Sequence, residues 1–314
     1  MMFKRILFPL DGSNFAEKVL PHLPRFSDPT QTHVELLGVL ETRRYVSTIG
    51  YAPLDVGDLY TQYETYLQER VQQLQAQHYQ ADFKMADGDA AEKILEAAAA
   101  ISTDVIAMAT HGRSGVARWT LGSVAERVIQ GATLPVLLVR EATAATPEKI
   151  KRILVPLDGS TLAEKALLHA EKLVKATGAE LLLFQAIPLT ASEASFDHAT
   201  VQTALNARHE QLFANADAYL NSLALRLWTA DIPCKIMVLG GDPAQLIADI
   251  TRDSDIDMVV LSTHGRTGFN RWVHGSVANQ VIRSVNCPVL VIPNTETENV
   301  KEPIPASIGV PVAV

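Results

Sequence analysis

The stretch ATHGRSGVARWTLGSVAERVI, residues 109–129, returns as STHGRTGFNRWVHGSVANQVI at residues 262–282. From the histidine onward, ten of fifteen positions are identical in the two copies. A second pair, KRILFPLDGS from Lys4 and KRILVPLDGS from Lys151, matches at nine of ten positions. The copies lie 153 and 147 residues apart, which is too long for the unit of a solenoid. The sequence therefore predicts two duplicated domains.

The predicted boundaries place the first domain at 1–142, the second at 149–293 and an irregular C-terminal extension at 294–314. The segment EATAATPEKI from Glu141 is typical of a linker, because it is rich in Ala and Thr and contains a proline. The 314 residues suffice for two domains that each bury a core. The tail from Asn294 has three prolines and mixed polarity, which favours irregular structure.

Composition excludes several classes of protein. Apolar residues make up 47% and charged residues 20%, as in globular proteins. The net charge of −8 argues against nucleic acid as the main partner, because phosphate contacts need an excess of Lys and Arg. Cys234 and Cys287 show no metal-site spacing and are expected to be buried free thiols. No apolar run is long enough for a signal peptide or a membrane span, so we expect a cytoplasmic protein without a membrane partner.

In each copy, short apolar runs alternate with helix-length segments. Strands that are apolar throughout and separated by helices are typical of a parallel sheet covered on both faces. We therefore predict two α/β domains, each a doubly wound, Rossmann-like sheet of five parallel strands. The predicted strands are 6–10, 34–40, 81–88, 104–110 and 135–140, then 153–157, 179–187, 234–241, 257–263 and 288–293. The predicted helices are 16–23, 59–75, 90–100 and 122–129, then 163–178, 208–227, 242–253 and 275–282.

The first helix of the two copies should differ. Pro21 and Pro24 stand where the second copy has Leu168 and Glu171. A proline inside a helix removes a hydrogen bond and clashes with the carbonyl four residues earlier, at a cost of about 3 kcal/mol. The first helix is expected to kink or stop near Leu20.

The glycines of the repeated motif suggest an anion site. Gly112 follows a strand and allows a tight turn, and Gly122 and Ser123 open a helix, where Ser123 can cap and Gly122 admits a ligand. The N–H groups of a helix's first turn attract anions such as phosphate. A Walker A lysine is absent from the sequence. The counterparts in the second copy are Gly265, Gly275 and Ser276.

Asp11 and Asp158 follow the first strand of each copy and precede Gly-Ser. A carboxylate there can accept hydrogen bonds from a base or ribose, but Asp-Gly-Ser also suits a tight turn. His111 and His264 have neither a nucleophile nor a carboxylate at a telling spacing, so we expect them to line a pocket or to stabilise a loop rather than to catalyse a reaction.

These motifs resemble the tandem universal stress proteins, which carry two such domains in one chain. The ATP-binding members of that family have Gly-x-x-Gly, nine residues, and Gly-Ser or Gly-Thr. Here the first glycine is replaced by Ala109 in one copy and by Ser262 in the other, while the remaining glycines and the nine-residue spacing are kept. The resemblance covers the chain up to about Pro293.

The resemblance implies an ATP site in each copy. Adenine and ribose contacts would come from Pro9, Leu10, Asp11 and Val39, with Pro156, Leu157, Asp158 and Ala186 in the second copy. The pocket would be lined by Met108 and His111, with Leu261 and His264 in the second copy. Phosphate contacts would come from Gly112, Gly122, Ser123, Val124 and Ala125, with Gly265, Gly275, Ser276, Val277 and Ala278 in the second copy. Bound Mg²⁺ can bridge the phosphates.

The leading hypothesis is an ATP-binding regulatory protein of the stress response with little or no hydrolysis and no catalytic residue. One alternative is a slow ATPase or a nucleotidyl-transfer enzyme, but PLDGS supplies neither a phosphate-directed lysine nor an SGGxDS-like loop. The Ala109 and Ser262 departures leave a second alternative, a nucleotide-free interaction scaffold.

The last strand of each copy, PVLLVR at 135–140 and PVLVIP at 288–293, is expected to lie at a sheet edge. An uncovered apolar edge strand favours association with another strand, and the family resemblance points to the same interface. We therefore expect the two domains to pair through these strands about a pseudo-two-fold axis. The sequence leaves open whether two chains also form a homodimer, and it identifies no protein partner.

Overall fold

The computed structural model describes residues 3–41, 56–110, 121–140, 143, 149–188, 199–263 and 276–294. The first half contains, in order, β1 (Arg5–Leu10), α1 (Asn14–Glu17), a 3-10 helix η1 (Leu20–His22), α2 (Leu23–Phe26), β2 (His33–Leu40), α4 (Val56–Ala76), β3 (Gln80–Asp87), α5 (Ala90–Ala100), β4 (Val105–Ala109), α6 (Ser123–Gly131) and β5 (Val136–Val139). The second half contains β6 (Arg152–Pro156), α7 (Thr161–Thr177), β7 (Glu180–Ile187), α8 (Ala199–Thr229), β8 (Cys234–Gly240), α9 (Pro243–Asp253), β9 (Met258–Ser262), α10 (Ser276–Ser284) and β10 (Val289–Ile292).

The described strands form one ten-stranded sheet in the order β3-β2-β1-β4-β5-β10-β9-β6-β7-β8. All pairs within each half are parallel. Each half is thus a five-stranded, doubly wound unit, and the predicted α/β class is confirmed. The domain boundaries stay a prediction, because most of the residues between 140 and 149 lie outside the described ranges.

The two halves meet where β5 pairs with β10 in antiparallel fashion. Val136 faces Val291, Leu137 faces Leu290, and Leu138 faces Val289. With the repeat offset of 153 residues, Leu137 therefore pairs with its own counterpart, which is the signature of a two-fold axis through that pair. The predicted edge-to-edge pairing of the last strands is confirmed. It removes both apolar edges that isolated halves would expose.

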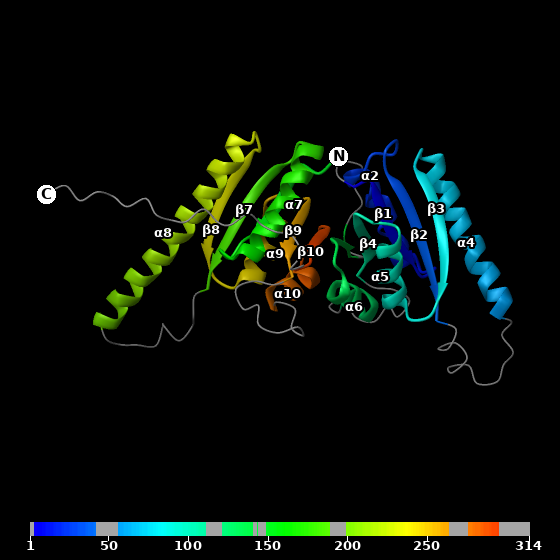
Figure 1. Cartoon of the computed structure of the whole chain (residues 1–314). Helices are drawn as coiled ribbons and strands as arrows, with labels where there is room; N and C mark the ends of the chain where they lie inside the picture. The colour runs from blue at the N-terminus through cyan, green and yellow to red at the C-terminus, as the bar shows by residue number, and fades with distance from the viewer. Residues whose placement is uncertain are drawn as a thin grey trace.

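Helices cover both faces of this sheet (Figure 1). One buried apolar cluster contains residues of α1, α2, α4, α7 and α8 and of the sheet face they cover. The other contains residues of α5, α6, α9 and α10 and of the opposite face. Each cluster includes residues of both halves, so the core is continuous across the β5–β10 junction. Figure 1 shows the halves side by side, with α4 and α8 at opposite outer edges.

The first helix is broken, as predicted. α1 ends at Glu17, and short helical turns η1 and α2 follow, whereas its counterpart α7 runs unbroken for 17 residues. The break comes after Glu17, three residues before Leu20, the position near which the sequence predicted it. Glu17 is the residue whose carbonyl lies four positions before Pro21, so the proline ring excludes a continuing helix there.

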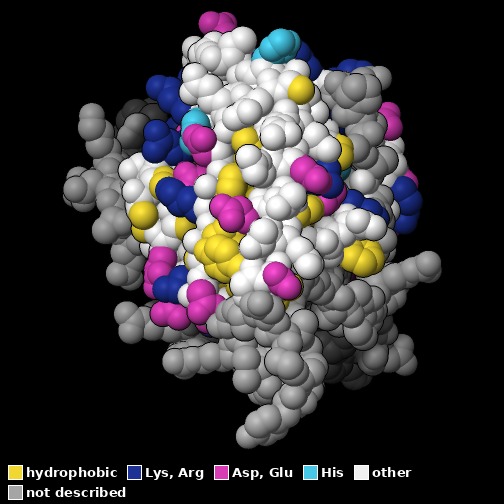
Figure 2. Space-filling model, turned by 90° about the vertical axis from the view of Figure 1, so that its right-hand side faces the viewer, with side chains coloured by type: hydrophobic (Ala, Val, Ile, Leu, Met, Phe, Trp, Pro, Cys, Tyr) yellow, Lys and Arg dark blue, Asp and Glu magenta, His cyan; other side chains and the backbone are white. Residues whose placement is uncertain are grey.

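The outer edge of the first half is a solvated surface. In α4, Tyr63, Leu67, Val71 and Leu74 are buried against the sheet at helical spacing, while Tyr60 is exposed. Figure 2 faces this edge and shows Lys and Arg interspersed with Asp and Glu and with small scattered apolar areas. The helix α4, which is rich in Tyr and Gln, is therefore amphipathic.

Two expectations about the whole chain can be checked on the described residues. Among these residues no helix is long and apolar enough to cross a membrane. Both cysteines are buried free thiols.

His22 is buried at the junction of the halves and should make stability depend on pH. Burial, followed by the positive charge of Arg25, lowers its pKa to about 4, and it hydrogen-bonds the backbone of Thr143. Above pH 6.5 the histidine is neutral in both folded and unfolded chains. Between pH 6.5 and 4 only the unfolded chain takes up the proton, so the free energy of unfolding falls as the pH falls.

We expect this group to remove about 2 kcal/mol between pH 7 and 4, since one pKa unit corresponds to about 1.4 kcal/mol and partial hydration reduces the full value. His22→Gln keeps an amide able to bond Thr143 but does not titrate. Urea unfolding of both proteins at several pH values tests this expectation. Parallel stability curves for the two proteins would contradict it.

Candidate functional site

The strand order places the predicted site residues at a switch point in each half. From β1 the chain continues to β2 and β3 on one side, then returns to β4 and β5 on the other. In the second half β6 lies between β7 and β9 in the same way. Doubly wound sheets bind ligands beyond the carboxyl ends of the two strands at such a point. Pro9–Asp11 and Met108 lie there in the first half.

Asp11 organises the turn that follows β1. Its Oδ1 accepts hydrogen bonds from the Ser13 backbone N–H (2.9 Å) and from the Ser13 hydroxyl (2.5 Å), and the Ser13 Oγ in turn caps α1. Asp158 and Ser160 repeat this arrangement at 3.0 and 2.6 Å. The turn-forming role of the two aspartates is therefore confirmed, and their contact with a ligand stays a prediction.

The start of α6 is held against the end of β4. The Gly122 N–H donates to the Thr110 carbonyl at 2.8 Å, and Thr110 donates to the Val139 carbonyl at 3.0 Å. Gly122 itself is the N-cap residue, with extended backbone angles, and Ser123 is the first helical residue. The expectation that Ser123 caps this helix is wrong, because the residue whose backbone leaves the helical conformation is the glycine.

The missing side-chain cap distinguishes α6 from α1, α5, α7 and α9. The caps of α1, α5, α7 and α9 are Ser13, Asp89, Ser160 and Asp242, and each accepts a first-turn N–H with its side chain. Gly122 makes no side-chain cap hydrogen bond. Within the part of the chain that the structure describes, no cap side chain occupies the N–H groups of the first turn of α6, which lie at the positive end of the helix dipole.

Most predicted contacts at the strand ends would come from the backbone, because the side chains are in the core. Leu10 and Leu157 are buried in the cluster beneath α4 and α8. Met108, Leu261, Ala125 and Ala278 are buried in the opposite cluster, against which Val39, Ala186 and Val124 also pack. Pro9 and Pro156 are partly buried, and Val277 is exposed.

The rest of the predicted site cannot be placed. His111, Gly112, His264, Gly265 and Gly275 lie outside the described residues. Ser276 begins α10, but only its backbone is described. The proposed lining histidines and the first phosphate-binding glycine of each copy therefore stay predictions.

Two side chains beside the first site, Tyr63 and Arg127, were not predicted from the sequence. The Tyr63 hydroxyl on α4 donates to the Leu10 carbonyl, and burial raises the pKa of Tyr63 above its usual value, so it remains a donor. In the second half Ala216 stands at that position, so the two sites differ. Arg127 of α6 pairs with Asp89 at 2.5 Å, and this hydrogen bond lowers the pKa of Asp89. An aromatic residue at a buried helix position was the only signal for Tyr63.

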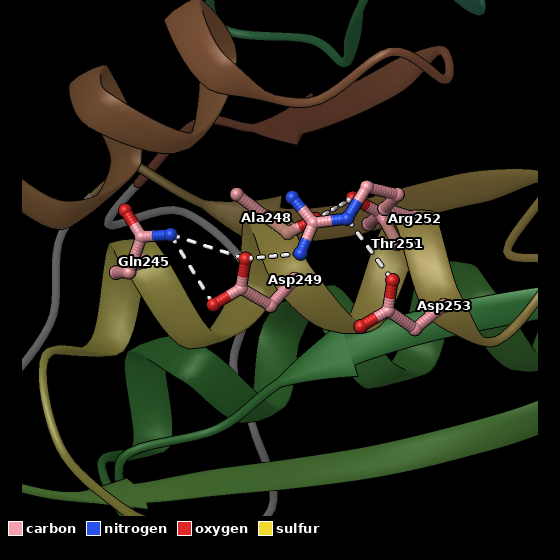
Figure 3. A network of polar contacts seen from close by, with 6 residues as sticks. All are labelled: Gln245, Ala248, Asp249, Thr251, Arg252 and Asp253. Carbon is pink, nitrogen blue, oxygen red and sulfur yellow. Dashed lines mark hydrogen bonds and ion pairs between the residues drawn. The ribbon is translucent and has the colours of Figure 1, made fainter.

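A polar network on α9 consists of exposed side chains (Figure 3). Asp249 accepts hydrogen bonds from Gln245 at 3.1 Å and Arg252 at 2.7 Å, and Arg252 also reaches Asp253 at 3.0 Å. All these bonds are exposed, and such pairs contribute about 0–1 kcal/mol each. Within the described ranges no group of three or more His, Cys, Asp and Glu could hold a metal ion.

The repeat, the fold and the switch-point geometry agree with what known proteins show. The sequence model of the Universal stress protein family matches residues 2–140 and 149–293. The universal stress protein Sll1388 of Synechocystis is 29% identical over 148 residues, which are 45% of this chain and 96% of that protein. The universal stress protein MJ0577 of Methanocaldococcus jannaschii is 30% identical over 156 residues, with shares of 45% and 96%.

A solved structure extends this likeness to the whole chain. The universal stress protein structure from Archaeoglobus fulgidus superimposes with a TM-score of 0.69 at 22% identity and covers 94% of this chain and 97% of its own. At that identity the likeness concerns the fold. With both halves matched by the family's sequence model, the chain belongs to the universal stress protein family, with two copies of its domain in tandem.

Proposed function

We propose that the chain binds ATP at two sites, one beyond each switch point, and acts as a regulatory protein of the stress response with little or no hydrolysis. The observation that carries the proposal is the start of α6, whose N-cap is a glycine without a capping side chain and which the Gly122–Thr110 hydrogen bond holds beside the end of β4. Backbone N–H groups at a helix start bind phosphate well, and a glycine cap leaves room for its approach.

In the first site, the N–H groups of Ser123, Val124 and Ala125 would bind phosphate oxygens, together with Gly112. The backbone at Pro9, Leu10 and Val39 and the Asp11 carboxylate would hold adenine and ribose. Mg²⁺, when bound with the nucleotide, would neutralise part of the phosphate charge. The second site would use the same positions of the second copy, which end with Val277 and Ala278 on α10.

We expect close to two ATP molecules per chain. The switch-point geometry and the Asp-Ser turn recur in both halves. The first helix breaks only after Glu17, beyond the turn that Asp11 and Ser13 form, and α6 belongs to a different part of the chain. Calorimetric titration of nucleotide-stripped protein measures the number of ATP molecules bound per chain. The Ser262 hydroxyl could give the second site a modestly higher affinity. A single site that Gly275→Val removes and Gly122→Val leaves intact would show that the first half is purely structural.

We expect ATP turnover well below about 1 s⁻¹, the low end for ordinary enzymes. Fast phosphoryl transfer needs positioned cations and an oriented water, and the motif supplies neither a Walker A lysine nor an identifiable general base. Phosphate release from ATP with Mg²⁺ in excess measures the rate. A turnover of about 1 s⁻¹ or more would instead favour the ATPase alternative.

One experiment distinguishes the ATP-binding function from the alternative of a nucleotide-free scaffold. Denaturing the freshly purified protein and identifying any released nucleotide tests occupancy directly. Released ATP supports the proposed function. A protein that releases no nucleotide and also rejects added ATP would be a scaffold.

A further inference from the structure

A groove of about 370 Å³ runs along the junction of the two halves. One wall is the outward face of α7, which belongs to the second half. Residues 133–135, which join α6 to β5 in the first half, line it as well, together with Ile292 and Pro293. A segment bound in this groove would touch both halves at once.

The α7 wall is positively charged around an apolar centre. Lys172 and Lys175 line the groove and are exposed, and Leu168, one helical turn before Lys172, also lines it and is 42% exposed. The acidic lining residue Glu171 pairs with Arg226 of α8 at 3.1 Å, so its charge is compensated. The groove therefore suits an extended, acidic segment of chain.

The chain that leaves β10 starts in this groove. Pro293 is one of its lining residues, and the Asn294 Oδ1 accepts a hydrogen bond from Lys165 Nζ at 3.2 Å. The residues that follow, TETENVKE at 295–302, contain three glutamates and one lysine. They lie outside the described residues, and their net negative charge complements the lysines of α7.

On the other side of the pseudo-two-fold axis, described residues at and after the end of β5 contact both halves. The Arg140 guanidinium donates to the Val285 carbonyl at 2.9 Å, and Thr143 is buried and bonded to His22 of η1. With the offset of 153 residues, Thr143 corresponds to Glu296. With the offset of 147 residues that applies to the first helix, His22 corresponds to His169 of α7, which lines the groove.

We propose that residues 295–302 occupy the groove of their own chain and place their glutamates against Lys172 and Lys175. The segment then joins the two halves a second time, across the axis from the linker. Its acidic side chains gain from the lysines, and its backbone covers Leu168. This inference is independent of nucleotide binding.

Carbodiimide cross-linking, which joins amines to carboxylates in direct contact, tests the placement in the full chain. A mixture of unlabelled and ¹⁵N-labelled protein is cross-linked and analysed by mass spectrometry. Links from Lys172 or Lys175 to Glu296, Glu298 or Glu302 within one isotopic form are expected. The absence of such links, or links only between unlike forms as from a second copy, would overturn the proposal.

Cleavage by a glutamate-specific protease gives a second measurement. In the variant with Lys172→Gln and Lys175→Gln, cleavage after Glu296 and Glu298 should become at least about fivefold faster than in the wild type, because the charge attraction is lost. Arg208→Gln with Lys235→Gln removes the same charge from α8 and β8, and should leave the rate unchanged. Equal rates in all three proteins would overturn the proposal.

Discussion

Gly122→Val is expected to remove one of two ATP molecules per chain, and Gly122→Val with Gly275→Val to weaken binding at least about a hundredfold, which corresponds to about 2.8 kcal/mol. Gly122 has φ −62° and ψ 144°, a conformation that valine adopts without strain. Its N–H bond to Thr110 can also remain. The valine side chain would instead occupy the space through which, in the proposed site, a phosphate reaches the N–H groups of α6.

Calorimetric titration gives affinity and stoichiometry, and far-UV circular dichroism checks that the fold is unchanged. Gly122→Ala adds a single methyl group and should have a smaller effect, so the series separates steric exclusion from loss of the fold. Wild-type affinity in a folded double variant would refute the argument that phosphate binds at these helix starts.

Asp257→Ala is expected to destabilise the chain by about 3 kcal/mol, because it removes the carboxylate that pairs with the buried Arg25 guanidinium and accepts two backbone N–H groups. Asp257 Oδ1 accepts a hydrogen bond from Arg25 of α2 at 2.8 Å, across the junction of the halves. The Arg25 side chain is only 5% exposed. Asp257 Oδ2 also accepts the backbone N–H groups of Lys151 and Arg152 at 2.8 and 3.1 Å.

The repeat offers a matched control. Asp104, the counterpart of Asp257, accepts the N–H groups of Lys4 and Arg5 at 2.7 and 2.8 Å and is exposed. Its replacement by alanine should cost about 1–2 kcal/mol, the range for lost hydrogen bonds. Urea unfolding gives both values. If the two variants lose equal stability, or if Arg25→Met fails to reduce the cost of Asp257→Ala, the ion pair does not stabilise the junction.

Local sequence patterns determined the order and type of the elements. Apolar runs and helical spacing predicted the ten strands and the main helices, because both depend on residues close together in the chain. Pro21 and Pro24 predicted the early end of the first helix, since a proline ring clashes with the carbonyl four residues earlier, and α1 ends at Glu17. The repeated Asp-Gly-Ser and Gly-Ser motifs, together with the doubly wound strand order expected from the alternating strands and helices, predicted where the candidate site lies.

Only the tertiary structure decided how that site and the junction are built. It made Gly122, and not Ser123, the cap of α6, with its N–H bonded to Thr110. It brought Tyr63 of α4 to the Leu10 carbonyl and Arg25 to Asp257, which are 53 and 232 residues apart in the chain. Such contacts depend on how complete elements pack against one another, and no local pattern of residues contains that information.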